Sequence, residues 1–135
     1  MYLPITPFSP AEVSAVIAPL NLHKAPGYDL ISEKVLQEIT PSAVALHTTL
    51  FNSILRLFCY PLLWKFAQII MVPKAGKPSH EVTSYRPVSL LPIPSKVFEK
   101  LLLKRLHTDV DLSNLIPGYQ FGFRPSHPLY NMRTQ

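Results

Sequence analysis

The sequence predicts an α+β fold that is mainly helical and contains one small antiparallel sheet. Four segments carry apolar residues at helical spacing, and two short runs rich in β-branched residues flank a turn. The length of 135 residues suits one domain, residues 1–135. The 15 prolines are spread along the chain between the predicted elements, and this distribution argues against disorder.

The first two helices are expected to be short. Ser9-Pro10-Ala11-Glu12 forms a capping box with proline at the first helical position, so a helix should begin here and end near Pro19. A loop follows at residues 24–29, in which Gly27 can take a positive φ. A second helix should start at Ser32 and turn three residues inward: Val35, Leu36 and Ile39.

The longest helix of the first half should begin at Pro41 and reach residues 60–61. Its broad apolar face comprises Val44, Leu50, Phe51, Ile54, Leu55 and Phe58. Cys59, at its end, is expected to be a buried structural thiol. Residues 67–72 read as a buried strand, residues 73–78 as a turn, and residues 85–91 as a returning strand in which Pro87 favours an edge or a bulge.

A final amphipathic helix is expected from Pro94. Its apolar stripe comprises Val97, Phe98, Leu101, Leu102 and Leu106, and its other faces carry Lys96, Glu99, Lys100, Lys104 and Arg105. Residues 119–124 look strand-like, and residues 129–135 would open another helix.

Charge is distributed unevenly along the chain. Residues 1–64 carry three basic and four acidic side chains, whereas residues 65–135 carry ten basic and four acidic ones. This asymmetry suits a polyanionic partner, and a solvated basic surface is the alternative. Only 16% of the residues are charged and 47% are hydrophobic, so some faces are expected to pack against parts outside this chain.

Several classes of protein and of site find no support in the sequence. The longest uncharged stretch, residues 39–55, contains Pro41, His47 and Asn52, and no stretch suits a membrane span. The five histidines are far apart and show no metal-ligand spacing, so no metal site is expected. Gly76-Lys77 lacks the upstream glycine and the following Ser or Thr of a phosphate-binding loop.

Six segments follow one another in a fixed order. They are Lys24-Ala25-Pro26-Gly27-x-Asp29, Pro73-Lys74-x-Gly76-Lys77-Pro78, Ser84-Tyr85-Arg86-Pro87-Val88-Ser89-Leu90-Leu91, Lys96-Val97-Phe98-Glu99-Lys100, Arg105-Leu106 and Gln120-Phe121-Gly122-Phe123-Arg124. The set closely resembles the N-terminal part of the reverse transcriptase domain of non-LTR retrotransposons of the jockey-like LINE type. The resemblance runs from about residue 6 to the end, and the family's first motif usually has proline in place of Tyr28 and glycine in place of Leu30.

The resemblance implies a fingers subdomain of a right-hand polymerase. By that likeness, Arg86 and Arg124 contact the triphosphate or the template backbone, and Lys74 and Lys77 lie in a fingertip loop. Two further residues, Lys24 and Gln120, belong to the same set expected to bind nucleotide or nucleic acid. A structural ion pair with Glu99 is the alternative role for Arg86, and a solvated helix face is the alternative for Lys96, Lys100 and Lys104.

The resemblance also implies partners that this chain does not supply. The complete enzyme would use an RNA template, a DNA primer, deoxynucleotides and Mg²⁺, the metal being held by palm carboxylates in motifs downstream of Gln135. The chain is therefore expected to be a partial domain that lacks the palm, has no catalytic residue and extends no primer by itself. The competing hypothesis is a non-catalytic basic module, or retrotransposon relic, that binds nucleic acid.

Overall fold

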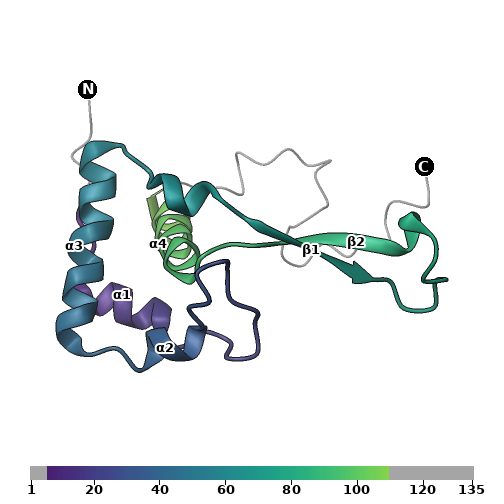
Figure 1. The fold of residues 1–135 in the computed structure, drawn as a ribbon. Helices are drawn as coiled ribbons and strands as arrows, with labels where there is room; N and C mark the ends of the chain where they lie inside the picture. Colours follow the sequence, from purple (N-terminus) through teal and green to yellow (C-terminus); the bar gives the residue numbers. More distant parts are fainter. Residues whose placement is uncertain (1–5, 110–135) are drawn as a thin grey trace, which may run out of the picture. The chain divides into compact units, whose positions relative to one another are not determined.

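The computed structural model describes residues 6–109 and confirms an α+β fold with one two-stranded antiparallel sheet (Figure 1). Its contacts divide the chain after Leu101 into two units, and the core and the sheet belong to the first. The predicted strand at 119–124 and the helix from 129 lie outside the described residues. In chain order the elements are α1 (Pro10–Ile17), α2 (Glu33–Gln37), α3 (Pro41–Leu57), the 3-10 helix η1 (Leu62–Lys65), β1 (Gln68–Pro73), the 3-10 helix η2 (Val82–Ser84), β2 (Tyr85–Leu90) and α4 (Ile93–Asp109).

Local capping signals set the start of the first two helices. At α1 the predicted capping box forms, because Ser9 Oγ accepts from the Glu12 N–H at 3.2 Å and Glu12 Oε2 accepts from the Ser9 N–H at 2.8 Å. Helix α2 starts after Ser32 as predicted, but its inward face differs: Leu36 is buried, whereas Val35 lies at the surface. Because α2 has only five residues, tertiary contacts and not periodicity decide which face is covered.

Helix α3 begins at Pro41 and is capped by the Thr40 hydroxyl, which accepts from the Ala43 N–H at 3.3 Å. Two residues predicted for its inward face are exposed. Leu50 lies about 100° around the helix from the buried Phe51. Phe58, 81% exposed, follows the helix in a left-handed conformation (φ 51°) that turns the chain away, and Cys59 after it is also exposed instead of buried.

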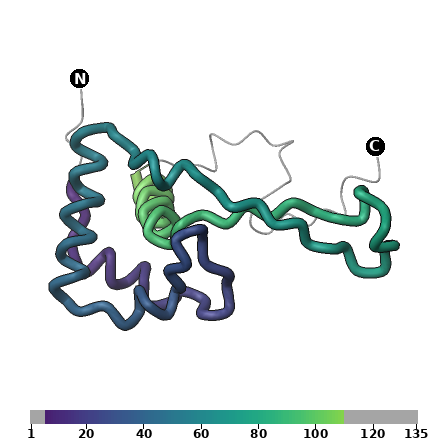
Figure 2. Tube along the Cα trace, viewed as in Figure 1, coloured from purple at the N-terminus to yellow at the C-terminus, as the bar shows by residue number. Residues whose placement is uncertain are grey.

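The core of the first unit is built around Phe98 on α4. Its ring contacts four other aromatic rings, with centroid separations of 5.6–6.3 Å: Phe8, Phe51, Tyr60 and Trp64. Helix α1 packs against α3, and the two lie side by side in the chain trace (Figure 2). The buried stripe of α4 ends at Leu101, so the prediction is wrong for Leu102 and Leu106, which are exposed.

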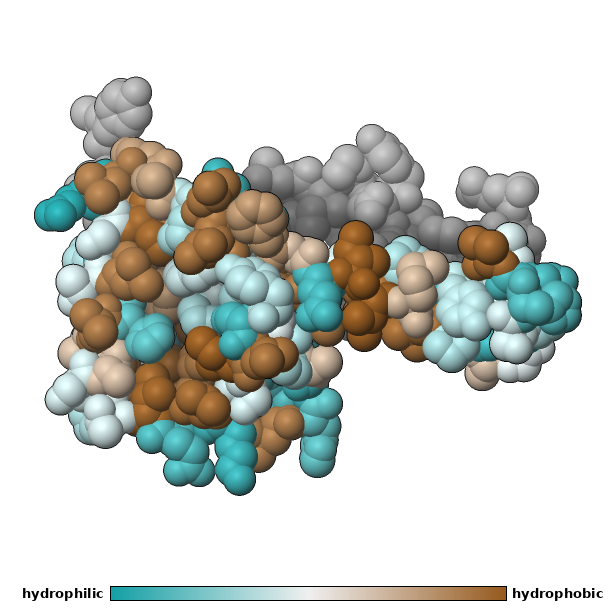
Figure 3. Space-filling view, in the orientation of Figure 1, coloured by the Kyte–Doolittle hydropathy of each residue, from teal (hydrophilic) through white to brown (hydrophobic). Residues whose placement is uncertain are grey.

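Strands β1 and β2 form a hairpin in which Val72 lies opposite Arg86 and Ile70 opposite Val88. The prediction that the first strand is buried is wrong, because Ile69 is 64% and Met71 53% exposed. Apolar side chains accordingly reach the surface of the hairpin (Figure 3). Among residues 6–109 no third strand pairs with either edge of the sheet, so neither strand gains the burial of a central one.

Two prolines occupy the hairpin without breaking its ladder. The Lys74 N–H donates to the Ser84 carbonyl at 2.7 Å, so residues 74 and 84 form a hydrogen-bonded pair. Hydrogen-bonded and non-hydrogen-bonded pairs alternate along an antiparallel ladder, so the next hydrogen-bonded pairs are 72/86 and 70/88. Pro73 and Pro87 occupy the intervening pairs, where an N–H would point to the outer edge. The predicted edge position of Pro87 is confirmed, and no ladder bond is lost.

The loop before α2 corrects one prediction about glycine. Gly27 does not take a positive φ; the left-handed positions of the described chain are Leu30 (φ 58°), Phe58 (φ 51°) and Gly76 (φ 74°). Gly27 instead lies so close to the Leu91–Pro92 backbone that a Cβ would approach the Pro92 nitrogen to 2.6 Å. Among residues 6–109, no helix is long and apolar enough to cross a bilayer.

Candidate nucleic-acid interface

Arg86 projects from β2 at an exposed position of the hairpin. Within residues 6–109 its guanidinium makes no recorded hydrogen bond or ion pair. The structure records no Arg86–Glu99 ion pair either, and Glu99 Oε1 accepts from the Tyr60 hydroxyl at 3.2 Å. The guanidinium therefore keeps its donors available for an external acceptor, such as two oxygens of one phosphate.

Lys74 and Lys77 flank the turn that follows β1, and their side chains differ in the hydrogen bonds that they make. Lys74 Nζ donates to the Thr83 carbonyl at 2.8 Å, which folds this side chain back along the turn. Lys77 is exposed, and its side chain has no recorded partner in the described part of the chain. Gly76 adopts the left-handed conformation that brings the Lys77 N–H to 3.3 Å from the Lys74 carbonyl.

The hairpin brings three of the six predicted binding residues together. Side chains alternate between the two faces of a strand, so Lys74 lies on the same face as Val72, two residues earlier. Val72 is opposite Arg86, so Lys74 and Arg86 share this face and are about 7 Å apart along the strand direction. Lys77 follows in the same turn. Lys24 is exposed in the loop before α2, with no recorded side-chain hydrogen bond or ion pair to a described residue. Gln120 and Arg124 lie outside the described residues.

Helix α4 carries a second basic feature in the first unit. Lys96 and Lys100 are one helical turn apart, the first half-buried and the second exposed. No ion pair is recorded for either within residues 6–109. This arrangement agrees with the solvated helix face that the sequence offers as an alternative, and it adds positive charge to α4.

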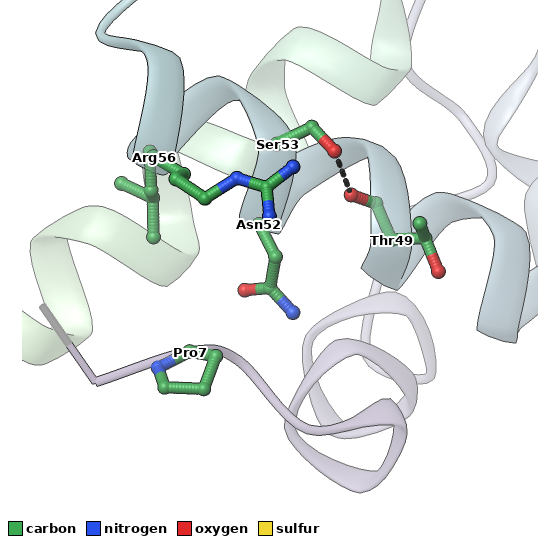
Figure 4. Close-up of a pocket in the computed structure, with 6 residues that line it drawn as sticks. Pro7, Thr49, Asn52, Ser53 and Arg56 are labelled. Atoms are coloured by element: carbon green, nitrogen blue, oxygen red, sulfur yellow. Dashed lines mark hydrogen bonds between the residues drawn. The ribbon is translucent and has the colours of Figure 1, made fainter.

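A cavity of about 580 Å³ lies along α3, at residues that the sequence does not single out (Figure 4). Its polar groups are mostly engaged. Asn52 bonds the Phe8 main chain, and the Thr49 and Ser53 hydroxyls donate to the carbonyls of Ala45 and Thr49. Phe8 is held along α3 beside this cavity by its two hydrogen bonds with Asn52, a long-range contact that no local pattern reveals. Among the described residues, the lining comprises Pro7, Thr49, Asn52, Ser53, Leu55 and Arg56.

The described residues do not fit a magnesium site. Nowhere in residues 6–109 do three His, Cys, Asp or Glu side chains gather closely enough to hold a metal ion. Glu33 is buried, and its Oε2 has no hydrogen-bond partner, but a single carboxylate oxygen does not make a metal site.

Among the described residues, the pKa of one group, the Tyr60 hydroxyl, departs clearly from its ordinary value. Burial raises the pKa of Tyr60 above its ordinary value of 10.0, and the negative charge of Glu99 acts in the same direction. A hydrogen bond with Ser95 acts in the opposite direction. The Tyr60 ring also contacts Trp64 edge-on and Phe98 at a tilt, so we assign it to the core.

Comparison with known proteins gives the family context of these segments. No protein-family profile matches the sequence. Among curated proteins, the chain is 45% identical to the RNA-directed DNA polymerase attributed to transposon X-element of Drosophila melanogaster and 43% identical to that of the mobile element jockey in the same species. The jockey polymerase of Drosophila funebris is 40% identical. Each match covers 127 residues, which are 94% of this chain and 14% of the relative. The homologues of this chain are therefore RNA-directed DNA polymerases of non-LTR retrotransposons, and the chain aligns with about one seventh of the length of each.

Proposed function

We propose that the chain is the fingers subdomain of an RNA-directed DNA polymerase and contributes binding of the RNA template and the incoming deoxynucleotide. The homologous polymerases and the mixed helical and hairpin fold support this proposal. The partners would be an RNA template, a DNA primer, deoxynucleotides and a palm domain. Magnesium would be held by residues other than 6–109, so we assign the metal no step on the described part of the chain.

The observation that carries the proposal is the unpaired guanidinium of Arg86 on an exposed hairpin. Arg86 has no side-chain hydrogen bond or ion pair to a residue within 6–109. It shares one hairpin face with Lys74, whose ammonium group is folded back onto the Thr83 carbonyl, so the guanidinium is the group more available to an external anion. Phosphate oxygens match the planar guanidinium, which donates two parallel hydrogen bonds, whereas a lysine acts as a point charge.

The contacts also rank the three hairpin cations. Arg86 has all its donors available, so it should contribute most. Lys77 is exposed at the turn and should contribute as a mobile point charge. Lys74 already donates one hydrogen bond to the Thr83 carbonyl, so it should contribute least to binding and more to the shape of the turn.

The proposal is tested by the affinity of the chain for an RNA template annealed to a DNA primer, measured by fluorescence anisotropy over a range of salt concentrations. Arg86→Gln should weaken binding and lower the slope of log affinity against log salt by about 1, as expected for one lost phosphate contact. The matched control is Arg56→Gln on α3, which removes the same charge from an exposed position outside the hairpin.

Equal losses in the Arg86 and Arg56 variants would contradict the proposal, because binding would then follow net charge alone, as in a basic module without a dedicated site. A deoxynucleoside triphosphate titrated against the same complex supplies a second measurement. Its affinity should fall in Arg86→Gln and in Lys77→Gln more than in Lys74→Gln.

A further inference from the structure

Both ends of the β1–β2 hairpin are held by the loop of residues 24–30. On the β1 side, the Tyr28 hydroxyl donates to the carbonyl of Leu63, in η1, at 2.7 Å. On the β2 side, Gly27 lies against the Leu91–Pro92 peptide, which follows the last residue of β2. Two adjacent residues of one loop therefore contact η1, the element that precedes the hairpin, and the Leu91–Pro92 peptide directly after it.

The contact at Gly27 leaves no room for a side chain. A Cβ there would lie 2.6 Å from the Pro92 nitrogen, 2.7 Å from the Leu91 carbonyl carbon and 2.8 Å from its oxygen. All three are backbone atoms, so no flexible side chain can move aside. Any larger residue must displace either the loop or the segment that joins β2 to α4.

The loop has its own hydrogen bonds, so it can act as a fixed support. The Leu30 N–H donates to the Gly27 carbonyl at 3.1 Å, which closes a turn with Tyr28 at its second position. Asp29 Oδ1 accepts from the Ile31 N–H at 3.3 Å, and Leu30 takes the left-handed conformation. These contacts fix the direction in which the Tyr28 ring leaves the loop.

The hairpin depends on its base because its strands bury little. Two-stranded hairpins are marginally stable without packing, and most side chains of β1 and β2 are exposed or only half-buried. At the base, the Trp64 ring contacts Phe51 and Tyr60 edge-on and Phe98 at a tilt, while Pro92 and Ile93 are buried. The loop ties these two anchored ends to each other.

We propose that Gly27 and Tyr28 are positioning residues that hold the hairpin, and with it Arg86, in one orientation relative to the core. The inference concerns the geometry of the hairpin, and its consequence for binding rests on the proposed function. Neither residue needs to contact nucleic acid. Each acts through the backbone at one end of the hairpin.

The orientation of the hairpin is tested by double electron–electron resonance, which measures the distance distribution between two spin labels attached to the whole chain. One label is attached at Ser79→Cys in the turn region and one at Leu46→Cys on the exposed side of α3, in a Cys59→Ser background. The distance distribution should broaden clearly in Tyr28→Phe and further in Gly27→Ala. A second label pair, Leu46→Cys with Lys100→Cys, reports on the helices and should not change.

The matched control is Tyr60→Phe, which also removes one tyrosine hydroxyl bond, in this case to Glu99 on α4. It should leave the hairpin distribution unchanged. An unchanged hairpin distribution in Tyr28→Phe would overturn the role of Tyr28, and an unchanged one in Gly27→Ala would overturn that of Gly27. If Gly27→Ala does not fold, the result for Tyr28→Phe alone decides whether the loop holds the hairpin in one orientation. Broadening of both label pairs together would indicate general loosening and would also overturn the proposal.

The consequence for binding is separated from the geometry by a double-mutant cycle. Tyr28→Phe should weaken RNA–DNA binding by about threefold to tenfold in the wild-type background and much less in the Arg86→Gln background. If Arg86→Gln itself has no effect on affinity, the proposed function fails, and the label distances still decide whether the loop positions the hairpin.

Discussion

The side-chain amide of Asn52 closes two hydrogen bonds with the main chain of Phe8, 44 residues earlier. The Phe8 N–H donates to Asn52 Oδ1 at 2.6 Å, and Asn52 Nδ2 donates to the Phe8 carbonyl at 2.9 Å. This pair holds the segment before α1 along α3. It thereby places the buried Phe8 ring edge-on to Phe98, with centroids 6.3 Å apart.

Asn52→Ala should lower the free energy of unfolding by about 1–3 kcal/mol, because it removes both hydrogen bonds that the Asn52 amide makes with the Phe8 main chain at a partly buried site. Urea unfolding followed by circular dichroism measures the change. The neighbouring Ser53→Ala removes only a hydroxyl bond to the Thr49 carbonyl and should change stability by less than about 0.5 kcal/mol. Similar losses in both variants would show that the Asn52 pair has no special role.

Leu30→Gly should stabilise the protein by about 0.5–1 kcal/mol. Leu30 is 78% exposed and left-handed (φ 58°), so the substitution removes backbone strain at little cost in packing. Leu30→Ala keeps the Cβ and should bring no such gain. Thermal unfolding of the two variants makes the comparison, and a lower melting temperature for the glycine variant would contradict the strain argument.

Gly76→Ala should destabilise only the hairpin turn. A Cβ at this position meets no atom within 4 Å, so the expected cost of about 1 kcal/mol comes from the positive φ alone. Exchange of the Lys74 amide, which bonds the Ser84 carbonyl, should then be about fivefold faster. Gly76→Asn, which tolerates this conformation better, should show a smaller change. Equal exchange rates in the wild type and both variants would contradict this reading.

The stability contributed by Tyr60 should decline in alkaline solution. The folded state raises the pKa of Tyr60, mainly by burial, so above the ordinary value of 10.0 the unfolded state releases this proton before the folded state does. The contribution is therefore complete below pH 10 and is lost as the pH rises past it. The difference in unfolding free energy between the wild type and Tyr60→Phe should shrink between pH 9 and pH 11. A constant difference would contradict the raised pKa.

The sequence by itself determined the elements whose signals are local. The capping box of Ser9 and Glu12, the helix start at Pro41 and the turn at Gly76 each depend on residues within a few positions of one another, and all three form. The antiparallel return of the second strand was predictable for the same reason. The order of the basic and glycine-containing segments was enough to indicate a resemblance to retrotransposon polymerases, and the curated relatives bear out that similarity.

Only the tertiary structure decided which surfaces are covered. Ile69 and Met71 have the composition of a buried strand, yet they lie on a hairpin that no third strand joins within the described residues. Gly27 has a local signature of backbone freedom, yet its actual constraint is the Leu91–Pro92 peptide more than 60 positions away. Periodicity states which residues share a face, but burial and close approach depend on what that face meets, and this is fixed by contacts between distant segments.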